Sequence, residues 1–355
     1  MAVIENFSIE DELREQVSVV AANGGEIQII GGGSKGFYGE AIEALPVDVC
    51  AHSGVIDYDP AELVITLRSG CKLVDVQALL AGNGQMFGFE PPCYSGEATI
   101  GGMIASGLAG PRRAYAGGIR DFVLGVKILD GRGEFLNFGG RVIKNVAGFD
   151  VSRVMVGALG TLGIILEVSI RVVPVVETEA TIVFQHPGVD EHIRWINELG
   201  SRPLPLSASL WHNGLSRIRL SGSEQGVSHA LQQLGGDNCE YDWAAIKEQK
   251  HDFFADGEAI TRVALPPASA DQLDNENQLI EWSGAQRWLS GEVDIPALRD
   301  QVAEQKAAVC AFRNHDRSVA VFHPLKAAML KLQRNLKSSF DPAGIFNPGR
   351  LYPGL

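Results

Sequence analysis

Glycine is distributed unevenly along this chain, and that distribution constrains its fold more than any other feature. Of the 41 glycines, 28 lie at or before residue 174, which is close to the middle of the 355-residue sequence. Glycine loses more backbone freedom on folding than any other residue, so clusters of it are costly and usually mark tight turns or close approach of a ligand. The first half of the chain is therefore predicted to be shaped around something that its backbone approaches closely.

The second half differs from the first in its aromatic content. All five tryptophans follow residue 174, and Pro174 closes the stretch TLGIILEVSIRVV at 161–173, whose pattern predicts a strand. A chain of 355 residues is also longer than one ordinary hydrophobic core requires. We therefore predict a first domain at 1–174, a second at 175–340 and a C-terminal segment at 341–355.

Local patterns in the first half predict helices and strands in no regular alternation. Helices are predicted over 11–25 and 72–84, strands over 26–30 and 61–70, and a β-hairpin over 122–140 with Asp-Gly in its turn. The first helix is amphipathic, and glycines close both helices. These elements indicate a mixed α+β fold and not a repeating βαβ array.

The net charge of the chain argues against some classes of binding partner. The net charge of −13 argues against nucleic acid, because binding to phosphate backbones depends on Lys and Arg, and it also argues against direct attachment to anionic lipid. No apolar run is long enough to cross a bilayer, and the first residues, MAVIENFSIEDELREQ, are acidic where a signal peptide is basic. We therefore expect a cytoplasmic protein.

Cysteine and histidine give no sign of a metal centre. The five cysteines are scattered without a Cys-x-x-Cys pair, which argues against a disulfide framework, a zinc site or an iron–sulfur cluster. The eight histidines show no spacing typical of metal ligands. We expect no metal in this chain.

The segment GGGSKG at 31–36 follows directly on the predicted strand at 26–30. Successive glycines can turn their N–H groups toward one point and bind an anion such as a diphosphate, with Ser34 and Lys35 adding to the grip. The segment matches neither the P-loop, which needs Gly-Lys-Ser/Thr, nor the Rossmann fingerprint, which needs a helix directly after its glycines. Taken alone, it indicates either a phosphate site or a structural turn.

Three further segments are rich in glycine and other small residues. They are PPCYSGEATIGGMIASGLAGPRRAYAGG at 91–118, GGRVIKNVAGFDVSRVMVGALGTLGII at 139–165 and DPAGIFNPGRLYPG at 341–354. Segments without bulky side chains allow a large flat or extended ligand to approach the backbone. Each could be a set of turns, but turns alone do not explain all four segments in this order.

The order of these motifs resembles that of FAD-linked oxidases with a p-cresol-methylhydroxylase (PCMH) or vanillyl-alcohol-oxidase type FAD-binding domain. The matching residues are GGGS at 31–34, ATIGG at 98–102, KNVAGFD at 144–150, GTLGII at 160–165 and DPAGIFNPG at 341–349. Within that family, two stretches are most similar to the FAD-binding subunits of bacterial glycolate oxidases, namely LAGPRRAYAG at 108–117 and IEWSGAQRWL at 280–289. The resemblance covers the first domain and the C-terminal segment.

This resemblance implies a fold, a cofactor and a reaction. The fold would be α+β, with a PCMH-type FAD-binding domain and a smaller, ferredoxin-like α+β cap. The cofactor would be non-covalently bound FAD, and the substrate would be glycolate, D-lactate or another small 2-hydroxy acid. The partners would be a related FAD-containing catalytic subunit and an iron–sulfur subunit, through which the protein would reach the inner membrane.

The resemblance also implies which residues contact FAD. The glycine loop at 31–36 would hold the diphosphate, and the segment at 99–106 would line the diphosphate and the ribityl chain. The segment at 160–165 would bind the adenosine half, and the C-terminal segment would return to the isoalloxazine ring. The implied residues are Gly31, Gly32, Gly33, Ser34, Lys35, Gly36, Thr99, Gly101, Gly102, Ser106, Gly160, Thr161, Gly163, Ile164, Ile165 and Asn347.

Some members of this family attach the flavin covalently, through a histidine in the first glycine loop or a cysteine before the second. The first loop has no histidine here, whereas Cys93 lies eight residues before Gly101 and leaves a thiol link open. We expect Cys93 to be an ordinary small residue. Lys144 and Asp150, in KNVAGFD, are expected to position their loop.

Oxidation of a 2-hydroxy acid needs a hydride acceptor, a base for the hydroxyl proton and a cation for the carboxylate. Many relatives bring a histidine-bound metal near Gly-Asp-Gly-Asn and Glu-His-Gly motifs, and this sequence has neither. Arg287 and Arg313 are the candidates for the carboxylate, although a surface position between core tryptophans explains Arg287 more simply. His315 is a candidate base, and Arg112 and Arg113 could neutralise phosphate or contact another subunit.

Three functions therefore stay open at the level of sequence. The first is the FAD-binding subunit of a multi-subunit glycolate oxidase that passes electrons onward. The second is a self-sufficient flavin-dependent alcohol or alditol oxidase, which needs a base within this chain. The third is a non-catalytic subunit that holds FAD as a scaffold.

Overall fold

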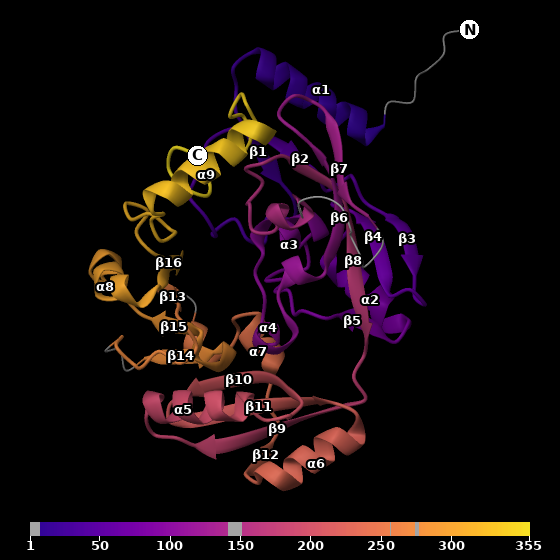
Figure 1. Cartoon of the computed structure of the whole chain (residues 1–355). Coiled ribbons are helices and arrows are strands. Elements are labelled where there is room, and N and C mark those ends of the chain that lie inside the picture. Colours follow the sequence, from indigo (N-terminus) through magenta and orange to yellow (C-terminus); the bar gives the residue numbers. More distant parts are fainter. Residues whose placement is uncertain (1–7, 141–150, 256, 274–276) are drawn as a thin grey trace.

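The strands divide between two sheets, and the division falls after Pro174 (Figure 1). The computed structural model describes residues 8–140, 151–255, 257–273 and 277–355. We call the elements of 8–174 the first lobe and those of 178–313 the second lobe. The predicted motif KNVAGFD at 144–150, with Lys144 and Asp150, lies outside the described residues.

The first lobe is built on a six-stranded antiparallel sheet. Its path is β3-β4-β8-β6-β7, and β5 pairs with β8 as well. A separate parallel pair, β1 and β2, lies next to the C-terminal segment, because Ile27 bridges Phe346. The strands are β1 (Ile27–Ile30), β2 (Leu45–Asp48), β3 (Val55–Asp59), β4 (Val64–Arg68), β5 (Gln85–Phe87), β6 (Val123–Leu129), β7 (Phe135–Gly139) and β8 (Ile164–Pro174).

The helices of the first lobe cover both faces of this sheet. They are α1 (Ile9–Ala22), α2 (Leu73–Gly82), α3 (Ile100–Ser106) and α4 (Arg113–Ala116), with the 3₁₀ turns Ile119–Asp121 and Val151–Met155. Strand β8 is buried on both faces along the stretches IIL and VSI, which the half-buried Glu167 separates. Its Ile165 and Val168 pack toward α2 and α3, whereas Ile164 and Leu166 pack toward α1.

The elements predicted in the first half are confirmed. Both predicted helices are present as α1 and α2, and the predicted strands are present as β1 and β4. Ser8 caps α1 by accepting the Asp11 N–H, and β6 and β7 form the predicted hairpin with Leu129 opposite Phe135. The mixed α+β fold class is likewise confirmed.

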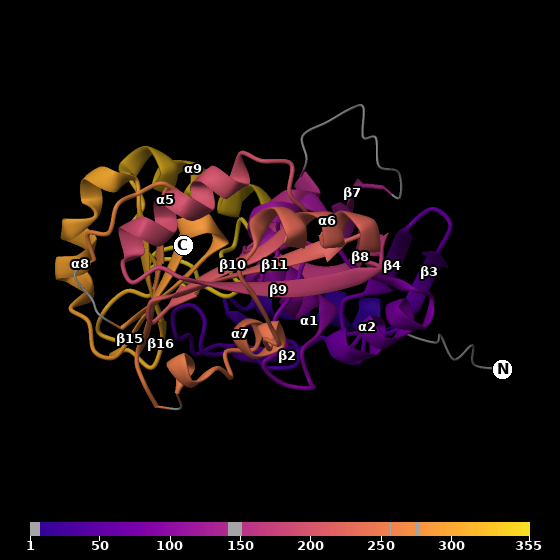
Figure 2. The same cartoon turned by 90° about the horizontal axis from the view of Figure 1, so that it is seen from below.

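The second lobe is one eight-stranded antiparallel sheet of order β12-β9-β11-β10-β14-β15-β13-β16. Its first part follows the order strand–helix–strand–strand–helix–strand, with the spatial order 4-1-3-2 of a ferredoxin-like unit. The elements of this part are β9 (Thr178–Gln185), α5 (Val189–Gly200), β10 (Leu206–His212), β11 (Leu215–Gly222), α6 (Glu224–Leu234) and β12 (Asp237–Cys239). Figure 2 shows α5 and α6 on one face of these strands.

Four further strands extend this sheet beyond the ferredoxin-like unit that the resemblance implied. They add a second half whose strands pair out of chain order, because β13 lies between β15 and β16. The elements are α7 (Trp243–Lys247), the 3₁₀ turn Asp252–Phe254, β13 (Ile260–Ala264), β14 (Gln278–Glu281), the 3₁₀ turn Trp282–Gly284, β15 (Gln286–Ser290), α8 (Ile295–Gln301), the 3₁₀ turn Ala303–Gln305 and β16 (Ala308–Arg313).

The chain finally returns to the first lobe. Helix α9 (Ala327–Phe340) packs Leu336 and Phe340 against the first-lobe core, beside which it lies in Figure 1. Buried Lys337 donates to the carbonyls of Thr161 and Phe346 and to the Asp341 carboxylate. This cluster fixes the C-terminal segment next to β1.

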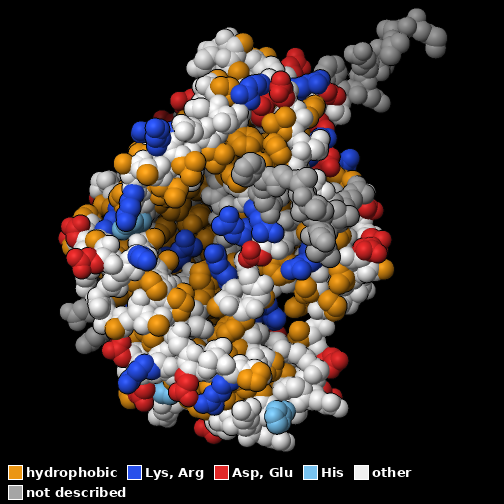
Figure 3. All heavy atoms as spheres, in the orientation of Figure 1, with side chains coloured by type: hydrophobic (Ala, Val, Ile, Leu, Met, Phe, Trp, Pro, Cys, Tyr) orange, Lys and Arg blue, Asp and Glu red, His pale blue; other side chains and the backbone are white. Residues whose placement is uncertain are grey.

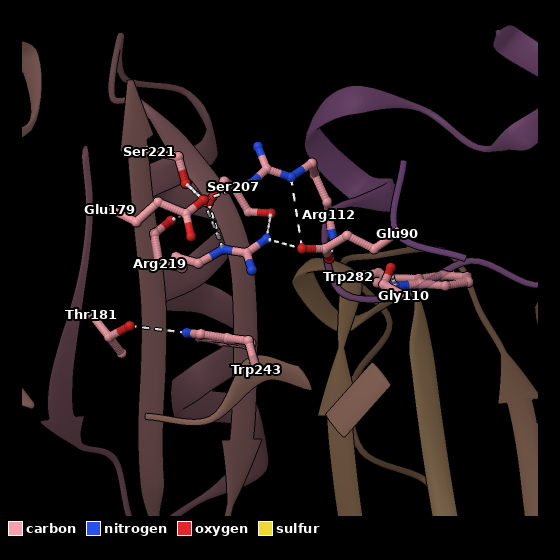
Figure 4. Close-up of polar contacts among 10 residues, drawn as sticks. All are labelled: Glu90, Gly110, Arg112, Glu179, Thr181, Ser207, Arg219, Ser221, Trp243 and Trp282. Carbon is pink, nitrogen blue, oxygen red and sulfur yellow. Dashed lines mark hydrogen bonds and ion pairs between the residues drawn. The ribbon is translucent and has the colours of Figure 1, made fainter. Parts of the chain in front are cut away.

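Ion pairs join the two lobes, as the close-up in Figure 4 shows. Arg219 of β11 lies 2.8 Å from Glu90 of the first lobe, and Arg112 lies 2.6 Å from Glu179 of β9. Trp282 donates its indole N–H to the Gly110 carbonyl at 3.0 Å. The Arg112 side chain, which the sequence left open, therefore connects the lobes within one chain.

Candidate functional site

A cavity of about 300 Å³ lies where the glycine-rich segments meet. Its walls come from the loop at 31–36, from α3 and the residues before it, from the loop at 159–165 and from the C-terminal segment. All but two of the residues implied as FAD contacts line it. Those that do are Gly31, Gly32, Gly33, Ser34, Lys35, Gly36, Thr99, Gly101, Gly102, Ser106, Gly160, Gly163, Ile165 and Asn347.

The two exceptions, Thr161 and Ile164, support the wall from behind. Ile164 is fully buried and faces the α1 side of β8. The Thr161 hydroxyl donates to the Ala158 carbonyl at 2.7 Å, and its own carbonyl accepts from Lys337. Both residues fix the loop that presents Gly160 and Gly163 to the cavity.

Close packing explains why some positions of the loop at 31–36 are glycine, and an open face toward the cavity explains the others. A Cβ on Gly31 would lie 2.7 Å from the Thr99 hydroxyl, and one on Gly32 would fall on the Glu97 carbonyl. Gly33 has a φ of +67° and faces open space, and Gly36 has room for a Cβ. The loop is therefore pressed against the 97–99 segment on one side and offers bare backbone to the cavity on the other.

Lys35 gives this open face a positive charge. Its ammonium donates to the Ser34 hydroxyl and the Cys93 carbonyl, and it has no carboxylate at ion-pair distance among the described residues. Burial lowers the pKa of Lys35 to about 8. A diphosphate beside it would compensate that buried charge, so the residues present fit the diphosphate of FAD.

The C-terminal segment holds two of the walls together. The Asn347 side chain accepts the Ile29 N–H at 2.8 Å and donates to the Leu159 carbonyl at 2.6 Å. Arg350 donates to the carbonyls of Gly36 and Tyr38, both at 2.8 Å. Arg350 was not among the residues predicted from the sequence, although it directly follows the FNPG motif.

We predict that a carboxylate at position 36 repels FAD, whereas a methyl group there does not. Gly36→Ala keeps FAD because a Cβ meets only the Gly33 carbonyl at 3.5 Å. Gly36→Asp lowers FAD affinity by about 10- to 100-fold, because like charges lie near one another in a partly desolvated site. Equilibrium titration of FAD into apoprotein measures both variants, and equal affinities would contradict this placement of the diphosphate.

The two arginines implied for the substrate do not lie at this cavity. Arg287 is fully buried on the face of β15 opposite to Trp288, where it pairs with Asp271 at 3.2 Å and donates to the Ser269 carbonyl. Arg313 donates to the Phe254 carbonyl at the end of β16. The structure brings neither arginine to the cavity and does not bring them together.

Other candidates from the sequence also lie outside the cavity wall. The His315 ring contacts the Thr261 hydroxyl at 3.1 Å. Cys93 is half-buried, with its sulfur 3.7 Å from the Gln77 side-chain oxygen, and burial raises the pKa of its thiol. Among the described residues, no group of three or more His, Cys, Asp or Glu is arranged to hold a metal ion. None of the described helices is long and apolar enough to cross a membrane.

A second cavity of about 200 Å³ adjoins the first and shares Tyr38 and Ser106 with it. Arg113 and Arg120 also line it. Figure 3 shows a hollow in the face of the molecule, with hydrophobic side chains along it and Lys and Arg side chains gathered at its edge. No local pattern could indicate a role for Arg113, because its neighbours in space come from distant segments.

Glu281 is a further ionisable residue that the sequence analysis missed. It is buried on the inner face of β14, where one carboxylate oxygen accepts from Trp288 at 2.7 Å and from Gln286 at 3.0 Å. The other oxygen has no hydrogen-bond partner among the described residues. Burial raises the pKa of Glu281 to about 7, so this carboxyl changes its protonation near neutral pH.

Comparisons with known proteins agree with this geometry. Residues 3–139 match the FAD binding domain family. The chain is 40% identical to the glycolate oxidase subunit GlcE of Escherichia coli (strain K12), over 97% of each chain. It is 29% identical to the glycolate oxidase subunit GlcD of Bacillus subtilis (strain 168), over 41% of this chain and 31% of that protein.

One solved structure shows the same fold at much lower identity. Alkyldihydroxyacetonephosphate synthase superimposes with a TM-score of 0.65 and 15% identity, covering 95% of this chain and 75% of that one. The cofactor of the present chain is FAD, and its domain is of the PCMH type. The chain therefore belongs to the FAD-linked oxidoreductases with this domain and, within them, to the family of the glycolate oxidase subunit GlcE.

Proposed function

We propose that this chain is the FAD-binding subunit of a multi-subunit glycolate oxidase, and that its own FAD accepts hydride from glycolate or D-lactate. The observation that carries the proposal is the glycine-walled cavity with Lys35 at its open face, in a chain 40% identical to a glycolate oxidase subunit over nearly its whole length. FAD, when bound, supplies the hydride acceptor for oxidation of the substrate's C–OH group.

The residues of the chain have three tasks in this proposal. The backbone of the loop at 31–36 and the Lys35 ammonium bind the diphosphate. Asn347 and Arg350 hold the C-terminal segment against that loop and against β1. Tyr38, Ser106 and Arg113 line the second cavity, which leaves room for a small acid beside the cofactor site.

Transfer of electrons to other subunits is part of the same proposal. Two of the relatives are named as subunits of glycolate oxidase, which supports a complex with a related flavoprotein. We propose that an iron–sulfur subunit completes the complex and that any membrane contact is made through these partners. Purification through a tag on this chain, followed by analysis of flavin, iron and acid-labile sulfide, tests that composition.

The direct test of the reaction is the visible spectrum of the FAD-loaded chain, recorded anaerobically before and after glycolate is added. We expect the oxidised flavin band to bleach with glycolate or D-lactate and to persist with ethylene glycol, which lacks a carboxylate. A band that persists with both acids would indicate that the chain binds FAD but does not itself accept the hydride. Bleaching by uncharged alditols would instead favour a self-sufficient alcohol oxidase.

A further inference from the structure

Two arginines from opposite lobes lie near Tyr38, a residue that lines the second cavity. Arg113 of α4 lines it directly, with its guanidinium carbon 4.8 Å from the centre of the Trp282 ring. Arg262 of β13, in the second lobe, lines a different and smaller cavity together with Tyr94 and Glu281, and it donates to the Tyr38 hydroxyl at 3.2 Å. Tyr38 itself lines the second cavity, so it connects the two arginines.

Neither arginine has an acidic partner within the part of the chain that the structure describes. The Arg113 side chain makes no hydrogen bond or ion pair there, and its ring contact with Trp282 leaves the guanidinium edge free. Arg262 uses one of the five N–H groups of its guanidinium, the one that donates to Tyr38. Asp121 is the nearest acid that acts on Arg113, and its carboxylate accepts the Gly118 N–H instead.

The two positive charges oppose each other in this position. Burial lowers the pKa of Arg113, and the charge of Arg262 lowers it further. Burial also acts to lower the pKa of Arg262, but Tyr38 and Cys310 outweigh it and raise that pKa. Arg120, which also lines the cavity, adds a third positive charge. Like charges gathered in a partly desolvated place are unfavourable unless an anion joins them, and this cluster lies in a chain of net charge −13.

We propose that Arg113 and Arg262 bind the carboxylate of the substrate, a small 2-hydroxy acid, in the second cavity. A planar guanidinium matches a carboxylate through two parallel hydrogen bonds, and two guanidinium groups fix its orientation. The cavity adjoins the glycine-walled one through Tyr38 and Ser106, so the acid lies next to the cofactor site. The inference rests on the proposed function, in which this chain's own FAD is reduced.

This assignment replaces the arginines that the sequence singled out. Arg287 is already paired with Asp271 on the outer face of the sheet, whereas the registers place Arg262 opposite Trp288 and Cys310 on the inner face. Tyr38 is a positioning residue, because its hydroxyl holds the Arg262 guanidinium at the cavity.

The test uses the full chain loaded with FAD and titrated anaerobically with oxalate, a two-carbon acid that has no C–H bond to oxidise. Binding is followed through the change in the flavin spectrum. Arg113→Gln and Arg262→Gln are each expected to raise the Kd for oxalate about 10- to 100-fold, as loss of a charge-assisted hydrogen bond predicts, with FAD affinity unchanged. Arg262→Lys, which keeps the charge but not the planar fork, is expected to give an intermediate Kd.

Arg194→Gln is the matched control, because Arg194 is exposed on α5 and its loss changes the net charge equally. Arg113→Gln is expected to fold normally, because the Arg113 side chain only stacks on Trp282. This variant therefore tests the inference even if Arg262→Gln does not fold. Wild-type oxalate affinity in both glutamine variants would overturn the inference and leave the proposed function intact. Loss of FAD in both variants would also overturn it, by assigning the arginines to the cofactor.

A different result would contradict the proposed function itself. If the wild-type chain holds FAD but neither binds oxalate nor is bleached by glycolate, hydride transfer does not occur at this chain and the inference falls with it. If glycolate bleaches the flavin equally fast in the wild type and in both glutamine variants, the function stands and only the carboxylate assignment is wrong.

Discussion

Replacing Lys337 with methionine is expected to lower the free energy of unfolding by about 3–5 kcal/mol, the usual cost of removing one member of a buried ion pair. The Lys337 ammonium donates to Asp341 at 2.8 Å, to the Thr161 carbonyl at 2.8 Å and to the Phe346 carbonyl at 2.6 Å. Asp341 is almost fully buried, so the variant leaves its charge without a cation. Thermal unfolding, measured with and without FAD, records the loss.

A second variant separates the lost charge pair from lost packing. In Lys337→Met with Asp341→Asn, the buried carboxylate is gone, and the new amide oxygen can still accept one of the N–H groups of Ile345 and Phe346 that now bind Asp341. The double variant is expected to recover a large part of the stability, as a double-mutant cycle for a coupled pair requires. Equal stability of the single and double variants would show that the ion pair does not hold this segment.

The single variant Lys337→Met is also expected to weaken FAD binding, because Lys337 and its hydrogen-bond partners lie between two walls of the cofactor cavity. Lys337 holds the Thr161 carbonyl on one side and the Phe346 carbonyl on the other, directly before Asn347. Loss of this link frees the C-terminal segment to move away from β1. FAD affinity that stays at the wild-type value in the folded variant would contradict this role.

The residues that line the glycine-walled cavity could be predicted because their information is local. Each glycine-rich segment is contiguous, and the segments resemble known motifs in order, so the walls of the cavity followed without a three-dimensional structure. The sequence alone did not explain why individual positions in these segments must be glycine. Gly32 is required because the loop presses on the Glu97 carbonyl, a contact between distant segments that no local pattern reveals.

The proposed carboxylate site could not be predicted, because it depends on which face of a sheet each residue occupies. In β15, Gln286 and Trp288 face inward whereas Arg287 faces outward, and alternation alone does not say which face is which. Arg113 and Arg262 meet only because the second lobe folds back over α4. The added strands β13–β16, which carry Arg262, pair out of chain order and gave no signal as a set.

Replacing Glu281 with glutamine is expected to stabilise the protein at pH 8 and to change little at pH 5. Burial, the largest cause, raises the pKa of Glu281 to about 7 from an ordinary value of 4.5, and Glu90 adds to the shift. The folded protein therefore favours the neutral carboxyl. The neutral Glu281 carboxyl contributes about 3 kcal/mol to the free energy of unfolding for a pKa shift of this size. This contribution is fully present below pH 4.5 and is lost as the pH rises through 7.

Glutamine suits this position because one oxygen of Glu281 already accepts both hydrogen bonds, from Trp288 and Gln286. An amide oxygen can keep both bonds, and the amide NH₂ then replaces the oxygen that has no partner among the described residues. Tyr94 and Arg262 line a small cavity together with Glu281, and both are unchanged in the variant.

The measurement is the thermal unfolding midpoint of both proteins at pH 5 and pH 8, with the exposed Glu304→Gln as control. The difference between Glu281→Gln and wild type should grow with pH, whereas the control difference should stay constant. A Glu281→Gln difference that is the same at both pH values would mean that the carboxyl is ionised throughout this range. Its charge would then be compensated in the fold by a neighbour such as Arg262.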